Sequence, residues 1–101
     1  MPAKRALVIE WSARSLKQTA GIQDYLITKF SEKEVAGFYD LLLSFESTVA
    51  RFPDLYPKFS GRKKLHRAVL NKNLSVYYSV TKSRIFMVSV LDNRMDHSKL
   101  I

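Results

Sequence analysis

Hydrophobic residues recur along the chain with two different periods, and the change of period separates predicted strands from predicted helices. An apolar, strand-forming run covers residues 6–11, and Ser12 directly after it is a credible helix N-cap. From Ala13 onward the apolar positions take helical spacing. The predicted buried side of this first helix consists of Leu16, Ala20, Ile22, Leu26, Ile27 and Phe30. The polar residues predicted to point away from it are Lys17, Gln18, Asp24 and Lys29.

A second helix is predicted with clear signals at both ends. Ser31 and Glu34 fit a capping box, and Pro53 disfavours helical geometry in the residue before it. Between them lies an apolar stripe at spacings of three and four: Val35, Phe38, Leu42, Phe45, Val49 and Phe52. Because almost no linker separates the two helices, they are expected to form an antiparallel hairpin.

Three further strand-length runs cover residues 65–70, 74–80 and 85–91. The middle run alternates, which predicts one face packed on the helices and one face, including Ser75 and Tyr77, in solvent. The last run is apolar on both faces, as expected of a central strand. The sequence therefore predicts a single α+β domain over residues 1–101, in the order β-α-α-β-β-β. We expect the antiparallel helical hairpin to pack on one face of a mostly antiparallel four-stranded sheet.

The formal net charge of +8 lies entirely in the second part of the chain. Residues 1–57 hold seven Lys/Arg and seven Asp/Glu, whereas residues 58–101 hold ten Lys/Arg and two Asp/Glu. Such a distribution indicates a surface that meets an anionic partner. There are no cysteines, and the two histidines, His66 and His97, make no recognisable metal site. No run is apolar enough to span a bilayer or direct export, so we expect a cytoplasmic protein with no metal, cofactor or membrane partner.

Several short motifs occur in a fixed order along nearly the whole chain. They are Ile9-Glu-Trp11-Ser, Phe52-Pro53 with Tyr56-Pro57, Leu65-His-Arg67-Ala-Val-Leu70, Val76-Tyr-Tyr78-Ser-Val80 and Val90-Leu-Asp-Asn-Arg94. In this order and at these separations they resemble the RelE/ParE superfamily, the toxins of bacterial type II toxin–antitoxin pairs. The resemblance implies growth inhibition, a role in plasmid stabilisation, and a cognate antitoxin, commonly acidic, that neutralises the toxin.

The superfamily contains two chemistries, and the residues present separate them. RelE-like members cleave messenger RNA at the ribosome, whereas ParE-like members lack the nuclease residues and are known for poisoning DNA gyrase. Cleavage without metal needs a base, an acid and cations on the phosphate. By resemblance, Arg94 matches the arginine after the fourth strand, and Lys63 and Lys64 match the basic loop. The third-strand arginine is replaced by Ser75, and only His97 is available as an acid in the tail.

We therefore interpret the chain as a ParE-like toxin that inhibits by binding a target, with gyrase as the expectation from the family. The alternative is a RelE-like messenger RNA endonuclease acting at the ribosome, with Arg94, Arg67, His97 and Lys64 as its catalytic candidates. A third interpretation is a basic nucleic-acid-binding domain without toxicity. The sequence contains no base-reading motif that would support it.

The predicted target- or antitoxin-binding residues are Arg62, Lys63, Lys64, His66, Arg67, Tyr77 and Arg94. Structural roles are predicted alongside the functional ones. Arg94 can pair with Asp92 or Asp96, His66 can be a packing histidine, and Tyr77 can stack on a base or pack on a partner's side chain. The groove between the helical hairpin and the sheet is the predicted place for the apolar anchors of an antitoxin.

Overall fold

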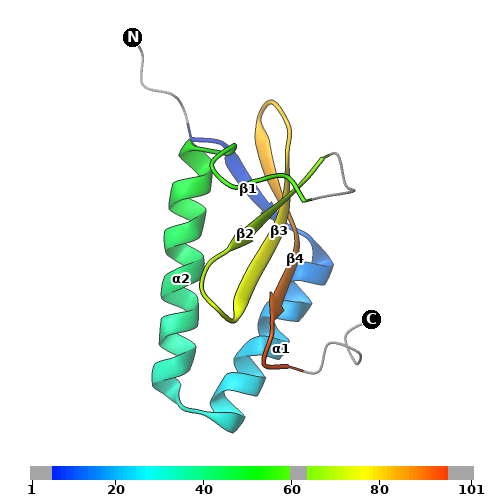
Figure 1. Ribbon diagram of the computed structural model, residues 1–101. Coiled ribbons are helices and arrows are strands. Elements are labelled where there is room, and N and C mark those ends of the chain that lie inside the picture. Colours follow the sequence, from blue (N-terminus) through cyan, green and yellow to red (C-terminus); the bar gives the residue numbers. More distant parts are fainter. Residues whose placement is uncertain (1–5, 60–63, 96–101) are drawn as a thin grey trace.

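The computed structural model describes residues 6–59 and 64–95 of the 101-residue chain. Its elements follow the predicted order β-α-α-β-β-β (Figure 1). Their bounds are Val8–Trp11 (β1), Ala13–Lys29 (α1), Glu32–Arg51 (α2), Leu65–Val69 (β2), Leu74–Val80 (β3) and Arg84–Asp92 (β4). Within the described ranges, no helix is both long and apolar enough to cross a membrane.

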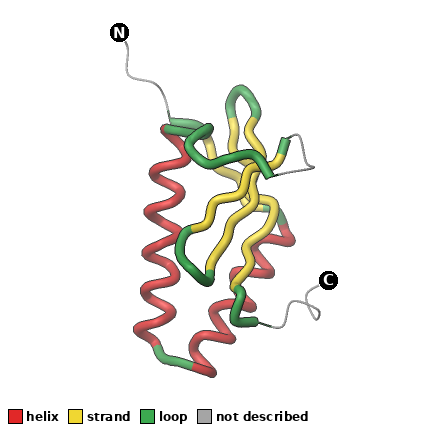
Figure 2. Tube along the Cα trace, viewed as in Figure 1, coloured by secondary structure: helices red, strands yellow, loops and turns green. Residues whose placement is uncertain are grey.

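The four strands form one sheet in the order β1-β4-β3-β2 (Figure 2). β2, β3 and β4 make an antiparallel meander, and β1 lies parallel to β4. The Asn71 side chain closes the turn between β2 and β3, because its Oδ1 accepts the N–H groups of Asn73 and Leu74, both at 2.8 Å. The predicted α+β class, the mostly antiparallel sheet and the central position of β4 are confirmed.

The two helices form an antiparallel hairpin against one face of the sheet, and the core lies between these layers (Figure 1). Each fully buried large apolar side chain contributes about 1.5–3 kcal/mol to folding. The buried apolar stripe of α2 supplies one wall of the core, and inward-facing residues of β3 and β4 supply the other. The principal members are Phe38, Leu42, Phe45, Val49, Val76, Tyr78, Ile85, Met87 and Val90.

Both ends of α2 follow from local sequence. Ser31 is the N-cap, and its hydroxyl oxygen accepts the N–H of Glu34 at 3.4 Å. The helix ends at Arg51, before Pro53. The prediction that Phe52 continues the buried stripe is wrong, because its side chain is 61% exposed. Phe52 has left helical geometry (φ −129°, ψ 70°), so helical spacing no longer sets the direction of its side chain.

The predicted buried side of α1 is wrong for four of its six residues. Ile22 and Leu26 are buried as expected, but the polar residues Ser15 and Gln18 are buried with them. The residues that are exposed instead are Leu16, Ala20, Ile27 and Phe30.

The position of α1 beside β4 explains why polar residues are buried. β1 stops at Trp11, so none of the described strands pairs with the rest of β4 on that side. The side chain of Gln18 takes the place of the missing strand, because its Oε1 accepts the N–H of Val90 at 2.9 Å and the hydroxyl of Ser89 at 3.0 Å. The Ser12 hydroxyl, which caps α1, also donates to the Val88 carbonyl at 3.2 Å.

Ser75 does not face solvent as predicted, since it is only 4% exposed. It lies on β3 between its register partners Val69 of β2 and Leu91 of β4, whose larger side chains flank it. A small side chain in the middle of a sheet is covered by its neighbours even where no helix packs on it. Tyr77, two positions along β3, is half-buried.

Candidate functional site

The net positive charge lies outside the helical hairpin, in the rest of the chain. Between residues 13 and 51, which include both helices, five Lys/Arg balance five Asp/Glu. The face of the sheet that the helices leave uncovered is called the open face here. It presents Arg67 and Tyr77, whose neighbours in sequence, His66 and Tyr78, point into the core.

Three side chains gather on the open face, and we call them the open-face cluster: Phe59, Arg67 and Tyr77. Arg67 lies opposite Tyr77 in the β2–β3 register, with its Cζ 5.9 Å from the centre of the tyrosine ring. The Phe59 ring stands edge-on to Tyr77, with 5.3 Å between the ring centres. Lys64 is exposed just before β2. A guanidinium and two aromatic rings on a basic surface suit an anionic partner that also offers flat or apolar groups.

Phe59 was not among the predicted site residues. Its position is fixed by a short pairing with β2, in which the Phe59 N–H donates to the Leu65 carbonyl at 2.6 Å. The signal in the sequence is an aromatic residue between basic ones, just before the basic loop. Arg62 and Lys63 of that loop lie outside the described residues, as does His97.

His66 is on the other side of β2 from Arg67 and is only 5% exposed. Its Nδ1 lies 2.8 Å from the Tyr56 carbonyl oxygen, and its ring stacks on Tyr78 with centres 4.9 Å apart. Tyr78 in turn donates its hydroxyl to the Pro53 carbonyl at 2.8 Å. Burial raises the pKa of Tyr78 to about 12. The structure thus places His66 in a packed aromatic cluster.

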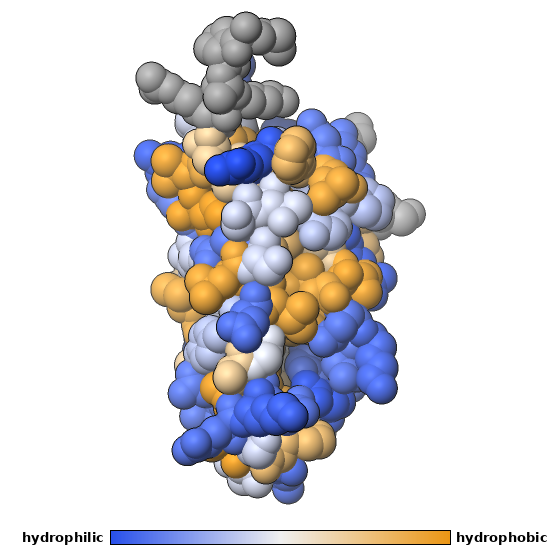
Figure 3. All heavy atoms as spheres, turned by 90° about the vertical axis from the view of Figure 1, so that its left-hand side faces the viewer, coloured by the Kyte–Doolittle hydropathy of each residue, from blue (hydrophilic) through white to orange (hydrophobic). Residues whose placement is uncertain are grey.

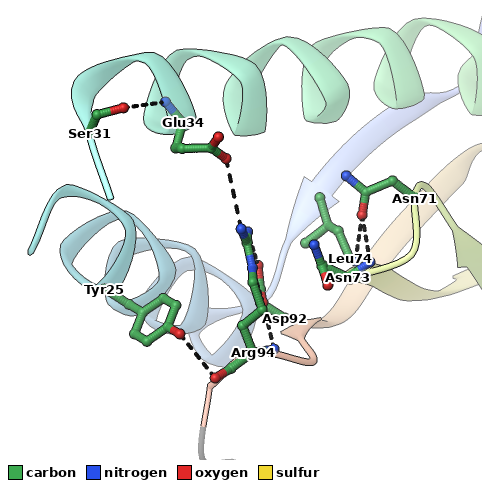
Figure 4. Close-up of polar contacts among 8 residues, drawn as sticks. All are labelled: Tyr25, Ser31, Glu34, Asn71, Asn73, Leu74, Asp92 and Arg94. Atoms are coloured by element: carbon green, nitrogen blue, oxygen red, sulfur yellow. Dashed lines mark hydrogen bonds and ion pairs between the residues drawn. The ribbon is translucent and has the colours of Figure 1, made fainter. Parts of the chain in front are cut away.

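Arg94 is held at the end of β4 by groups from three elements (Figure 4). Its guanidinium donates to both carboxylate oxygens of Asp92, at 2.8 and 3.1 Å, and lies 3.7 Å from the Glu34 carboxylate. Its Cζ sits 4.9 Å from the centre of the Phe30 ring, and its carbonyl accepts the Tyr25 hydroxyl at 3.0 Å. The hydrogen bonds to Asp92 raise the pKa of Arg94, so the guanidinium stays charged.

The nuclease candidates are therefore distributed over two places. Arg94 binds groups of the helical hairpin, whereas Arg67 lies over Tyr77 on the open face. Ser75, which the sequence comparison with RelE-like nucleases predicted to replace an arginine, is enclosed between its neighbours. Among the described residues, no group of three or more His, Asp or Glu side chains is placed to hold a metal ion.

A groove follows α2 on the side of β2 and the β2–β3 turn. One hollow of about 280 Å³ lies near the start of α2 and includes Leu41, Asn71 and Arg94 in its lining. A second of about 160 Å³ lies further along α2, and Leu41 lines both. Viewed from the α2 side, the apolar surface forms separate groups with polar side chains between them (Figure 3). This groove lies between the helical hairpin and the sheet, in the predicted position.

Comparison with known proteins identifies the fold. No protein-family model matches the chain, and no curated protein matches it. The structure is similar to a chain of the chromosomal ParDE TA system from P. aeruginosa, with a TM-score of 0.73 and 9% sequence identity. The match covers 88% of this chain and 98% of that chain. The chain therefore has a RelE/ParE-type fold, and at this identity the likeness shows the fold alone.

Proposed function

We propose that the chain is the toxin of a type II toxin–antitoxin pair, acting in the cytoplasm by binding a cellular target and neutralised by an acidic antitoxin. We place it closer to ParE than to RelE, with gyrase as the target expected from the family. Support for a toxin comes from the fold, which resembles a component of a ParDE system.

The observation that favours binding over catalysis is the environment of Arg94. A guanidinium that stabilises a phosphate during cleavage must direct its donors at that phosphate. Here the Arg94 guanidinium faces Asp92 and Glu34 and lies over Phe30. In this proposal Arg94 is a structural residue, and the open-face cluster with Lys64 contacts the target.

Induced expression without antitoxin tests the proposal, and wild-type protein should arrest growth. Arg67→Glu should relieve the arrest, because it reverses the charge of the open-face cluster. Arg14→Glu is the matched control, since Arg14 is exposed at the start of α1, within the charge-balanced helical layer. Arrest by the control together with relief by Arg67→Glu supports the open face. A healthy culture expressing folded wild-type protein would rule out a toxin.

Purified protein separates the two chemistries. We expect inhibition of gyrase supercoiling and no cleavage of messenger RNA, with or without ribosomes. RNA cleavage by the wild type that disappears in a folded Arg94→Lys variant would overturn the binding proposal in favour of a RelE-like nuclease. Arg94→Lys is used because it keeps a cation beside Asp92 while changing the bidentate geometry.

A further inference from the structure

The apolar stripe of α1 faces solvent. Leu16, Ala20 and Ile27 lie on one side of the helix, and all three are exposed, Leu16 at 56% and Ile27 at 44%. The opposite side of α1, which packs on the sheet, includes the polar residues Ser15 and Gln18. A surface helix normally directs its apolar stripe toward a partner. The described part of the chain leaves this stripe uncovered.

An apolar hollow adjoins the stripe, where the two helices diverge from the loop that joins them (Figure 1). It measures about 180 Å³, and its lining includes Trp11 of β1, Leu16 of α1 and Leu43 of α2. Trp11 is held in place by Glu46 of α2, which accepts the indole N–H at 2.9 Å. Leu43 is 62% exposed. Two exposed leucines on one hollow form a continuous apolar surface, which indicates an interaction site more strongly than isolated exposed residues do.

The charges of the two helices make this surface complementary to a second copy of itself. α1 holds three Lys/Arg and one Asp/Glu, a net charge of +2. α2 holds two Lys/Arg and four Asp/Glu, a net charge of −2. Lys17 of α1 and Asp40 of α2 are among the exposed members. In a two-fold dimer that places α1 of each copy on α2 of the other, both contacts join opposite charges.

The rest of the chain favours this face over any other for contact between two copies. Residues 13–51 are neutral as a whole, so the net charge of +8 lies entirely outside them. An acidic partner would be drawn to that positive part, whereas two copies would repel each other there. Contact through the hairpin directs the two open faces away from each other.

We propose that the outer side of the helical hairpin binds a second copy of this chain, in a two-fold dimer with Leu16 of each copy against Leu43 of the other. The apolar contact is small, so the dimer is weak, with a dissociation constant on the order of 10 µM. Such a dimer presents two open-face clusters on opposite sides. The dimer does not depend on the proposed function.

Sedimentation velocity of the purified full-length protein, from about 1 to about 300 µM, measures the association. We expect monomers at the lowest concentration and dimers at the highest. Leu43→Lys enters the interface twice and should weaken association about tenfold or more. Leu55→Lys is the matched control, because Leu55 is 59% exposed and lies outside the hairpin, and it should associate like the wild type. Circular dichroism checks that both variants are folded.

Two results of this experiment would overturn the proposal. One is a wild-type protein that stays monomeric at the highest concentration, which would leave the hairpin face to a partner of another sequence. The other is an equal effect of the two lysine variants. A chain that dimerises as expected but does not arrest growth would refute the proposed function alone.

The absence of cysteine from the sequence allows introduced cysteines to test the arrangement of the two copies. Leu16→Cys and Leu43→Cys proteins are mixed and oxidised, and the linked peptides are identified by mass spectrometry. Because a disulfide needs the two Cα atoms within about 7 Å, we expect the link between these variants to form much faster than a link from either one to Leu55→Cys. Equal rates would overturn the contact of α1 with α2 of the second copy.

Discussion

Replacing Arg94 with alanine should destabilise the fold substantially. The Asp92 carboxylate is 1% exposed, and the Arg94 side chain is 26% exposed. Removing one partner from a fully buried ion pair costs about 3–5 kcal/mol, because the other charge stays buried without compensation. Asp92 would still accept the backbone N–H of residue 94, at 2.8 Å, and Arg94 is partly in solvent. We therefore expect a loss of about 2–3 kcal/mol in the free energy of unfolding.

Urea unfolding followed by circular dichroism measures this loss, with the midpoint shifting at an unchanged slope. Arg84→Ala is the matched control, because Arg84 pairs with Glu10 in a surface ion pair whose side chains are 55% and 39% exposed. Exposed pairs contribute about 0–1 kcal/mol, so the control should remain near the wild type. An Arg94→Ala protein within about 0.5 kcal/mol of the wild type would refute the structural role of Arg94.

Two further substitutions test features that are specific to this fold. Gln18→Leu should lower the free energy of unfolding, measured in urea, by about 1–3 kcal/mol, because the buried Val90 N–H loses its acceptor. The control Lys17→Leu, on the exposed side of α1, should change this free energy little. Equal losses in the two variants would contradict the role of Gln18. The pKa of Tyr78, raised to about 12 by burial, means that the folded state holds the phenolic proton more tightly than the unfolded chain. The stabilisation that depends on the protonated Tyr78 hydroxyl is fully present below about pH 10 and is lost as the pH rises toward 12. Tyr78→Phe leaves the Pro53 carbonyl without its donor and should lower the free energy of unfolding by about 0.5–1.5 kcal/mol at neutral pH. In this variant the free energy of unfolding should fall less steeply between about pH 10 and about pH 12 than in the wild type. An equally steep fall in both proteins would contradict the raised pKa of Tyr78.

Local signals in the sequence were sufficient to predict most of the fold. Ser12 and Ser31 cap the two helices as expected, and Pro53 follows the end of α2. The apolar residues of β3 face the helices, and the two-sided apolar run of β4 lies inside the sheet. These features depend on neighbouring residues or on strand alternation, so they can be read from the sequence without knowing the partners of each element.

The orientation of α1 could not be predicted in this way. Hydrophobic spacing favoured a buried side containing Leu16 and Ile27, but the helix packs against the part of β4 that β1 leaves uncovered. There the backbone N–H of Val90 needs an acceptor, and Gln18 supplies it. Which side of a helix is buried then depends on hydrogen bonds to a strand more than seventy residues away. Long-range geometry also brought Glu34 and Phe30 to Arg94, which no local pattern indicated. The pairing of Arg94 with Asp92 is local, and pairing with Asp92 or Asp96 had been predicted from the sequence.

The separation of Arg94 from Arg67 changes how loss of toxicity in mutants should be interpreted. Arg94 joins the end of β4 to both helices, so its replacement weakens the fold and lowers any activity that needs the folded protein. Arg67 is exposed and contacts Tyr77 alone among the described aromatic rings, so its replacement should leave stability nearly unchanged. Loss of growth arrest in Arg94→Ala is therefore evidence about chemistry only if the variant is as stable as the wild type. Loss of arrest in a stable Arg67→Glu variant is direct evidence for contact through the open face.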